Sequence, residues 1–161
     1  MSQEPITLCA GVTGFYRRGD FVPVGVSLAA FERELTERLR RTSWSVLVFE
    51  PDGVCRSFHR ARIQRRGGGA PIQLLLNPYA RILAAATEVD EAGWRPCAFE
   101  FLPVPPDVER ACPDDWRAAR PVELDRALQP SDLVVLRPVE MKQVRYWQPE
   151  TLADVLFNYW D

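Results

Sequence analysis

The chain has 161 residues, of which 47% are hydrophobic and 26% are charged, and its formal net charge is −2. This length fits a single domain, and the hydrophobic fraction excludes an intrinsically disordered chain. No apolar run approaches the ~20 residues that a membrane-spanning helix requires. The composition therefore predicts one globular domain over residues 1–161, with no membrane among its partners.

The cysteines and the first residues of the chain predict its compartment. Residues 1–5 lack the basic segment and the apolar run of a secretory signal, which indicates a cytoplasmic protein. Disulfides are rare in the cytoplasm, so free thiols are expected at all four cysteines, which are Cys9, Cys55, Cys97 and Cys112. With a single histidine, His59, and no C-x-x-C pair, the sequence predicts no metal site and no cofactor.

The N-terminal part of the chain predicts short strands and then one helix. Residues 6–24 hold apolar runs broken by glycines, which favours one or two strands with a hairpin around 17–20. Ser27 is a suitable cap for a helix over about 27–41. Apolar side chains recur at helical spacing in that segment, at Leu28, Phe31, Leu35 and Leu39.

The middle of the chain predicts an antiparallel meander, because turn sequences separate its apolar segments. Strands are expected at 44–49, 54–65, 72–76 and 94–102. Residues 78–90 fit two interpretations. Asn77-Pro78 is a helix-start signal, whereas residues 80–88 also suit a strand, and we favour the helix.

Prolines punctuate residues 103–130, where only short helical turns fit, at 106–111 and 121–128. The pattern beyond this segment predicts a buried strand at 133–136, a strand or extended segment at 139–147 and a closing helix. The sequence thus predicts a single α+β domain with a mainly antiparallel sheet and two principal helices, at about 27–41 and 149–160.

The most polar segment is the arginine-rich stretch 56–66. Alternate residues of a strand share a face, and one face would then carry Arg56, Phe58, Arg60, Arg62, Gln64 and Arg66. Such a face suits a nucleic-acid backbone and a stacked base, or an acidic protein surface. The plainest interpretation is the solvated face of an antiparallel sheet.

The C-terminal segment is the most distinctive, because residues 145–161 hold five of the 17 aromatic residues. On a helix, its apolar side chains would cover an arc of roughly 200°, wider than the ~100° stripe that packing against one core requires. Either the helix is buried on most sides, or part of it docks on another protein, since Trp, Tyr and Arg dominate interface hot spots. The candidate partner-binding residues here are Arg145, Tyr146, Trp147, Phe157, Tyr159 and Trp160.

No catalytic constellation is predicted. Cys55 and His59 would share a strand face, but four residues of strand separate them by ~13 Å, too far for a catalytic pair. The glycines at 67–69 lack a phosphate-loop pattern and are expected at a hairpin tip. Glu100 interrupts an apolar strand, and alternation explains it as an outward-facing residue.

The sequence therefore predicts a non-catalytic cytoplasmic module that binds another protein, as an inhibitor, an immunity factor or a regulatory subunit does. The partner is another protein, with a second copy of the same chain as one possibility. Two alternatives stay open. One is a small enzyme of unrecognised class that uses Glu100, Cys55 or His59, and the other is a nucleic-acid binder through residues 56–66.

Overall fold

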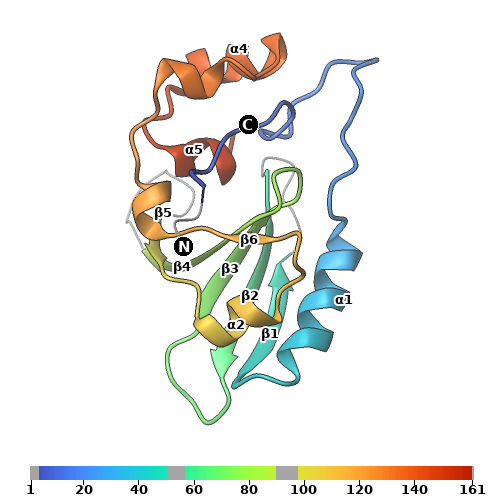
Figure 1. The fold of residues 1–161 in the computed structure, drawn as a ribbon, viewed down its shortest axis with the longest axis vertical. Coiled ribbons are helices and arrows are strands. Elements are labelled where there is room, and N and C mark those ends of the chain that lie inside the picture. The colour runs from blue at the N-terminus through green and yellow to red at the C-terminus, as the bar shows by residue number, and fades with distance from the viewer. Residues whose placement is uncertain (1–3, 51–56, 90–97, 161) are drawn as a thin grey trace.

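A computed structural model describes residues 4–50, 57–89 and 98–160. Its centre is an antiparallel meander in which the strands follow one another in chain order (Figure 1). The strands are β1 (Trp44–Glu50), β2 (His59–Arg65), β3 (Ile72–Asn77), β4 (Ile82–Val89) and β5 (Ala98–Leu102). The short strand β6 (Arg117–Ala118) pairs with β4 in parallel. The meander confirms the predicted α+β class.

Helices surround this sheet and account for the rest of the regular structure. They are α1 (Leu28–Leu39), α2 (Pro106–Ala111), α3 (Pro121–Leu124), a 3-10 turn (Pro130–Leu133), α4 (Pro138–Trp147) and α5 (Leu152–Leu156). None of the described helices has the length and apolar character needed to cross a membrane.

The central strands of the sheet are buried on both faces, and the two faces carry separate hydrophobic clusters. On one face, Ala61 and Ile63 of β2 pack with Phe31 of α1. On the other face, Leu75 of β3 packs with Val155 of α5 and with apolar side chains of the N-terminal segment. Because both faces are covered, successive residues of β3 are buried rather than alternate ones.

The predicted first helix is confirmed as α1, although it ends at Leu39, two residues before the expected end. The hydroxyl of Ser27 accepts a hydrogen bond from the Ala30 amide at 3.1 Å, as expected of a helix cap. Phe31, Leu35 and Leu39 are its buried residues. The apolar stripe read from the sequence is therefore the face that covers the sheet.

The helix favoured over residues 78–90 is wrong, since this segment turns and then forms β4. The side-chain oxygen of Asn77 accepts from the Tyr79 and Ala80 amides at 3.1 and 2.9 Å, which makes a tight turn. Arg81 follows in a left-handed conformation, with φ at 56°, which a continuing helix does not allow. The chain then reverses into the sheet.

The strands expected within residues 6–24 are also absent from the described part of that segment, which forms turns and extended chain. Its apolar side chains Ile6, Leu8 and Val12 are nevertheless buried in the core. The glycines interrupt this segment too often for strand pairing, so it contributes single anchoring side chains instead.

The C-terminal third differs most from the sequence-based expectation. Where a buried strand was expected at 133–136, Leu133 ends the 3-10 turn and residues 134–136 are irregular chain, with Val134 80% exposed. Residues 139–147, expected as strand or extended chain, form most of α4. Pro138 occupies the first turn of α4, where the missing amide hydrogen of proline costs nothing.

The closing helix expected at about 149–160 is only the short α5. Beyond Leu156 the chain is held instead by Ser57. The backbone N–H of Ser57 donates to the backbone carbonyl of Asn158 at 3.2 Å, and the backbone N–H of Asn158 donates to the Ser57 hydroxyl at 3.1 Å. These contacts compete with further helical turns, which explains why the helix ends early.

A buried carboxylate joins the two ends of the chain. Glu140 of α4 is fully buried. Its oxygens accept from the Gly11 amide at 3.0 Å, the Thr13 amide at 3.2 Å, the Thr13 hydroxyl at 2.8 Å and the Arg137 amide at 2.9 Å. Gly11 has φ at 89°, a conformation that favours glycine. The carboxylate thereby fixes α4 against the N-terminal segment.

We expect Glu140→Gln to lower the free energy of unfolding by about 2 kcal/mol, because a buried donor left without an acceptor costs ~1–3 kcal/mol. Glutamine keeps the size of the side chain but turns one acceptor oxygen into an NH2 group. Urea denaturation measures the change. Glu150→Gln, at an exposed position, is the control and is expected to change stability by less than about 0.5 kcal/mol. Equal stability of Glu140→Gln and wild type would contradict this role.

Candidate protein-binding surface

The arginine-rich segment does not form one exposed row in the part of it that the structure describes. Phe58 and Arg60 are buried, at 1% and 8% exposure, and the Arg60 guanidinium donates to the Tyr159 hydroxyl at 3.3 Å. Arg62 is exposed. Arg66 lies beyond the end of β2 and donates to the Trp44 carbonyl at 3.3 Å. Arg56 lies outside the described residues.

The last aromatic residues belong to the core rather than to the surface. Phe157 and Trp160 are 5% and 7% exposed, and Tyr159 is partly buried. Phe58 is in edge-to-face contact with the rings of Phe157 and Tyr159, with centroids 5.7 and 5.2 Å apart. These side chains stabilise the packing between the sheet and the C-terminal segment. Of the aromatic side chains proposed for binding, Tyr146 and Trp147 are the exposed ones.

Tyr146 and Trp147 lie side by side at the end of α4. They are 75% and 37% exposed, and their rings meet edge to face with centroids 5.1 Å apart. The helix stops immediately after them, since Gln148 takes a left-handed conformation with φ at 50°. The buried Glu140 and Val144 anchor α4 to the core. The aromatic pair is thus carried on a fixed helix end.

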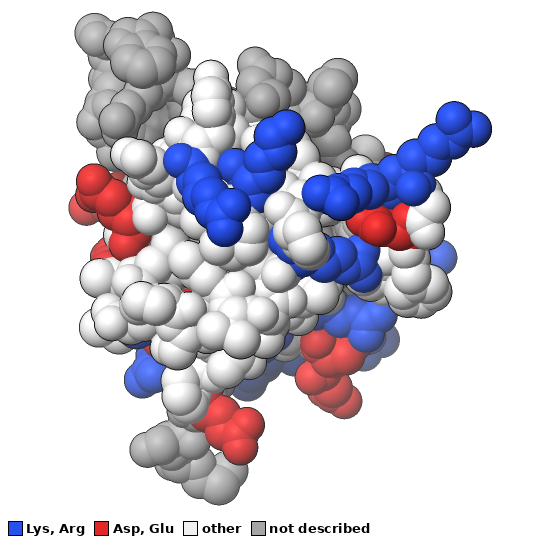
Figure 2. All heavy atoms as spheres, turned by 90° about the horizontal axis from the view of Figure 1, so that it is seen from above, with Lys and Arg blue, Asp and Glu red and all other residues white. Residues whose placement is uncertain are grey.

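Two cations flank this pair on α4. Lys142 and Arg145 are exposed, and neither forms an ion pair with any residue that the structure describes. Figure 2, which views the molecule from the end that carries α4, shows basic side chains projecting from this face. We call Lys142, Arg145, Tyr146 and Trp147 the α4 surface.

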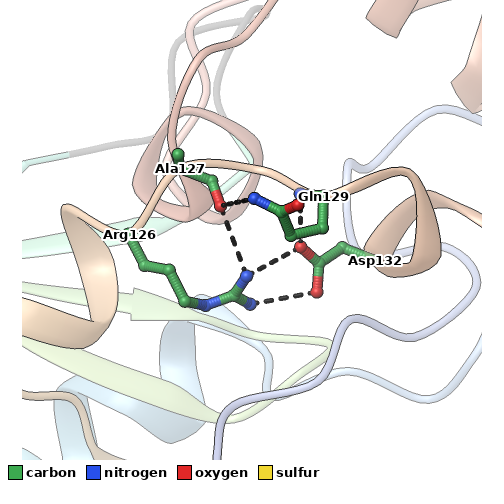
Figure 3. Close-up of polar contacts among 4 residues, drawn as sticks. All are labelled: Arg126, Ala127, Gln129 and Asp132. Atoms are coloured by element: carbon green, nitrogen blue, oxygen red, sulfur yellow. Dashed lines mark hydrogen bonds and ion pairs between the residues drawn. The ribbon is translucent and has the colours of Figure 1, made fainter.

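Hydrogen bonds around Asp132 hold the segment that the chain after α4 packs against. The Arg126 guanidinium binds the Asp132 carboxylate through two nitrogens, at 2.8 and 3.0 Å. The backbone N–H of Gln129 donates to the same carboxylate at 2.8 Å (Figure 3). We call residues 126–132 the Arg126–Asp132 loop. It pairs with the segment after α4, because the backbone N–H of Leu128 donates to the Glu150 carbonyl at 2.9 Å. These contacts fix the chain between the end of α4 and the start of α5.

The described residues do not assemble the catalytic site considered from the sequence. His59 is buried, its Nε2 donates to the Val26 carbonyl and its ring stacks on Phe31. Glu100 is exposed on β5, as alternation predicted. Cys55 lies outside the described residues. No cluster of three or more potential metal ligands occurs among the described residues.

The described thiols are free and poorly suited to nucleophilic attack. Cys9 and Cys112 form no disulfide. Burial raises the pKa of Cys9, with a smaller contribution from the charge of Glu140. Burial also raises the pKa of Cys112 to about 12. At neutral pH both are protonated thiols, which are weak nucleophiles.

The loop in Figure 3 makes stability depend on pH. The hydrogen bonds from Arg126 lower the pKa of Asp132 in the folded protein. The stabilisation is therefore present above the unfolded value of about 3.9 and is lost as pH falls through the lower folded pKa. We expect Asp132→Asn to cost about 1 kcal/mol at pH 7, with the difference from wild type shrinking in acid.

Chemical denaturation at pH 7 and in acid measures this difference. Asp125→Asn is the control, because Asp125 is exposed and forms no ion pair with the described side chains. It is expected to leave stability nearly unchanged at both pH values. A difference for Asp132→Asn that persists in acid would contradict an ionic origin.

Comparison with known proteins gives no relative from which a function could be transferred. The chain matches no family model, no curated protein and no solved structure. A function must therefore be inferred from its own residues.

Proposed function

We propose that this protein is a non-catalytic cytoplasmic module that binds an acidic partner protein through the α4 surface, as an inhibitor, immunity factor or regulatory subunit. The observation that carries the proposal is the aromatic pair at the end of α4. Tyr146 and Trp147 stay exposed while Phe157 and Trp160 of the same C-terminal segment are buried.

The position of this pair suits a binding anchor. Tyrosine and tryptophan bury a large area and lose little conformational entropy, and they are enriched among the residues that dominate binding energy. Tyr146 and Trp147 are also held by their surroundings, because Glu140 anchors one side of α4 and the Arg126–Asp132 loop supports the chain that follows. A fixed helix end limits the entropy that binding would cost.

The charges of the α4 surface favour an acidic partner. Lys142 and Arg145 have no ion-pair partner among the described residues, so acidic groups of another protein can approach them without displacing an existing contact. Arginine beside an exposed tryptophan also suits a nucleic acid. The net charge of −2 favours the protein partner, because nucleic-acid binders are commonly basic.

We expect the double variant Tyr146→Ser/Trp147→Ser to lose the partner. Tagged wild type is incubated with nuclease-treated lysate of the native host, and retained proteins are quantified by mass spectrometry. The retained partner is then purified and its dissociation constant measured by calorimetry. If the Tyr146 and Trp147 side chains each contribute about 2 kcal/mol to the free energy of binding, their loss raises the dissociation constant by ~10²–10³-fold.

Phe21→Ser is the matched control, because Phe21 is 75% exposed, as Tyr146 is, but lies on the N-terminal segment. It should bind within about twofold of wild type. Retention of the same partner by the double variant would refute the α4 surface as the binding site. A wild type that retains nucleic acid before nuclease treatment, and no protein after it, would refute the proposed partner class.

The two cations are expected to act mainly on the association rate. Replacing Lys142 and Arg145 with glutamine should slow association about tenfold at low salt and flatten its dependence on ionic strength, because exposed charges steer encounter. Stopped-flow or surface-based kinetics at two salt concentrations measure this. Arg110→Gln, an exposed arginine on α2, is the control. An unchanged association rate in Lys142→Gln/Arg145→Gln would exclude an acidic contact on the partner.

A further inference from the structure

The edge strand β1 is an unusual feature of the sheet, because two of its apolar residues are left uncovered. Among the described strands β1 pairs with β2 alone, so its other edge forms no strand pairing within the described residues. Leu47 and Val48 on this strand are 50% and 44% exposed. Edge strands are usually protected by charges or proline, and residues 46–49 contain neither.

A β-bulge at Leu47 interrupts the register between β1 and β2. A bulge increases the local twist and so limits how many residues a further strand can pair with. A partner for this edge would therefore need side-chain contacts beside the strand as well as backbone hydrogen bonds.

The outer face of α1 offers such contacts. Five side chains of α1, the C-cap residue Arg40 and Phe49 of β1 line a groove of about 470 Å³. The five are Ala29, Glu32, Arg33, Thr36 and Glu37. In Figure 1, α1 lies alongside the β1 edge of the sheet and away from α4. Phe49 lines the groove and lies on β1, so the groove adjoins the strand edge there, and we call the two together the β1 edge surface.

The charges along this groove are self-complementary. Glu32 and Arg40 both line it, and each lies four residues from Thr36, which is ~6 Å along the helix. If a second α1 runs antiparallel with the two Thr36 residues at the twofold axis, Glu32 of each copy lies opposite Arg40 of the other. Neither residue forms an ion pair with a described residue in the single chain.

We infer that the β1 edge surface is where a second copy of this chain binds, in a symmetrical dimer with antiparallel β1 strands and α1 helices. A twofold axis repeats each contact, so one complementary pair supplies two. Val48, which pairs with Arg62 and so lies on the sheet face away from α1, is then brought beside β1 of the other copy. This inference goes beyond the proposed function, because it concerns a different surface and a different partner.

Sedimentation velocity from 1 to 100 µM tests the dimer. Wild type is expected to be mainly dimeric at the upper concentration, and Val48→Lys should weaken the dimer at least tenfold. Val134→Lys is the control, because Val134 is 80% exposed away from this surface, and it should dimerise as wild type does. A wild type that stays monomeric at 100 µM would overturn the inference.

A charge reversal tests the arrangement of the two helices. Glu32→Arg should weaken the dimer by facing Arg40 of the other copy, and Glu32→Arg/Arg40→Glu should restore it. Circular dichroism and the melting temperature confirm that each variant folds. Weakening without restoration, or no weakening, would refute the antiparallel pairing. Tyr146→Ser/Trp147→Ser should remain dimeric, which separates failure of this inference from failure of the proposed function.

Discussion

The architecture depends on the buried carboxylate of Glu140. It accepts hydrogen bonds from Gly11 and Thr13, 129 and 127 residues away in the sequence. A buried polar group is tolerable when several donors surround it, and removal of those donors leaves a large desolvation cost. Two other side chains hold residues 11–13. The side-chain amide of Asn77 donates to the Val12 carbonyl, and the side-chain amide of Asn158 donates to the Thr13 carbonyl. Side chains from three distant segments thus converge on residues 11–13.

This convergence explains why the second face of the sheet is covered without a long helix. The N-terminal segment has no strand or helix among its described residues before α1, and α5 has five residues. Such segments have little stability alone. Their position is set by polar side chains inside the core, and their apolar side chains then pack on the sheet. Buried polar networks of this kind favour one arrangement over others because each unsatisfied group is costly.

The elements predicted correctly from the sequence are those with local signals. The Ser27 cap and the apolar stripe define α1, and the turn sequences separate the strands of the meander. The errors concern segments whose structure depends on distant residues. In the sequence Asn77-Pro78 resembles a helix start, but in the structure the Asn77 side chain closes a turn. In α4, Pro138 and Glu140 stand at positions typical of a helix start, a signal that could have been recognised.

The candidate site was predictable only in part. Its aromatic and cationic residues are evident in the sequence, but composition could not separate Tyr146, which is exposed, from Trp160, which is buried. That distinction depends on where α4 ends and on how the last residues pack.

The pairing of Ser57 with Asn158 and of Glu140 with Gly11 has a consequence for biosynthesis. A nascent chain that has emerged from the ribosome only as far as β5 lacks the groups that seat its own N-terminal segment. Chains grow at about 5–20 residues per second, so one face of the meander stays open to chaperones and to other nascent chains for seconds. Completion of the fold therefore waits for residues 140–160, and residues 11–13, although made well before them, are among the last to settle.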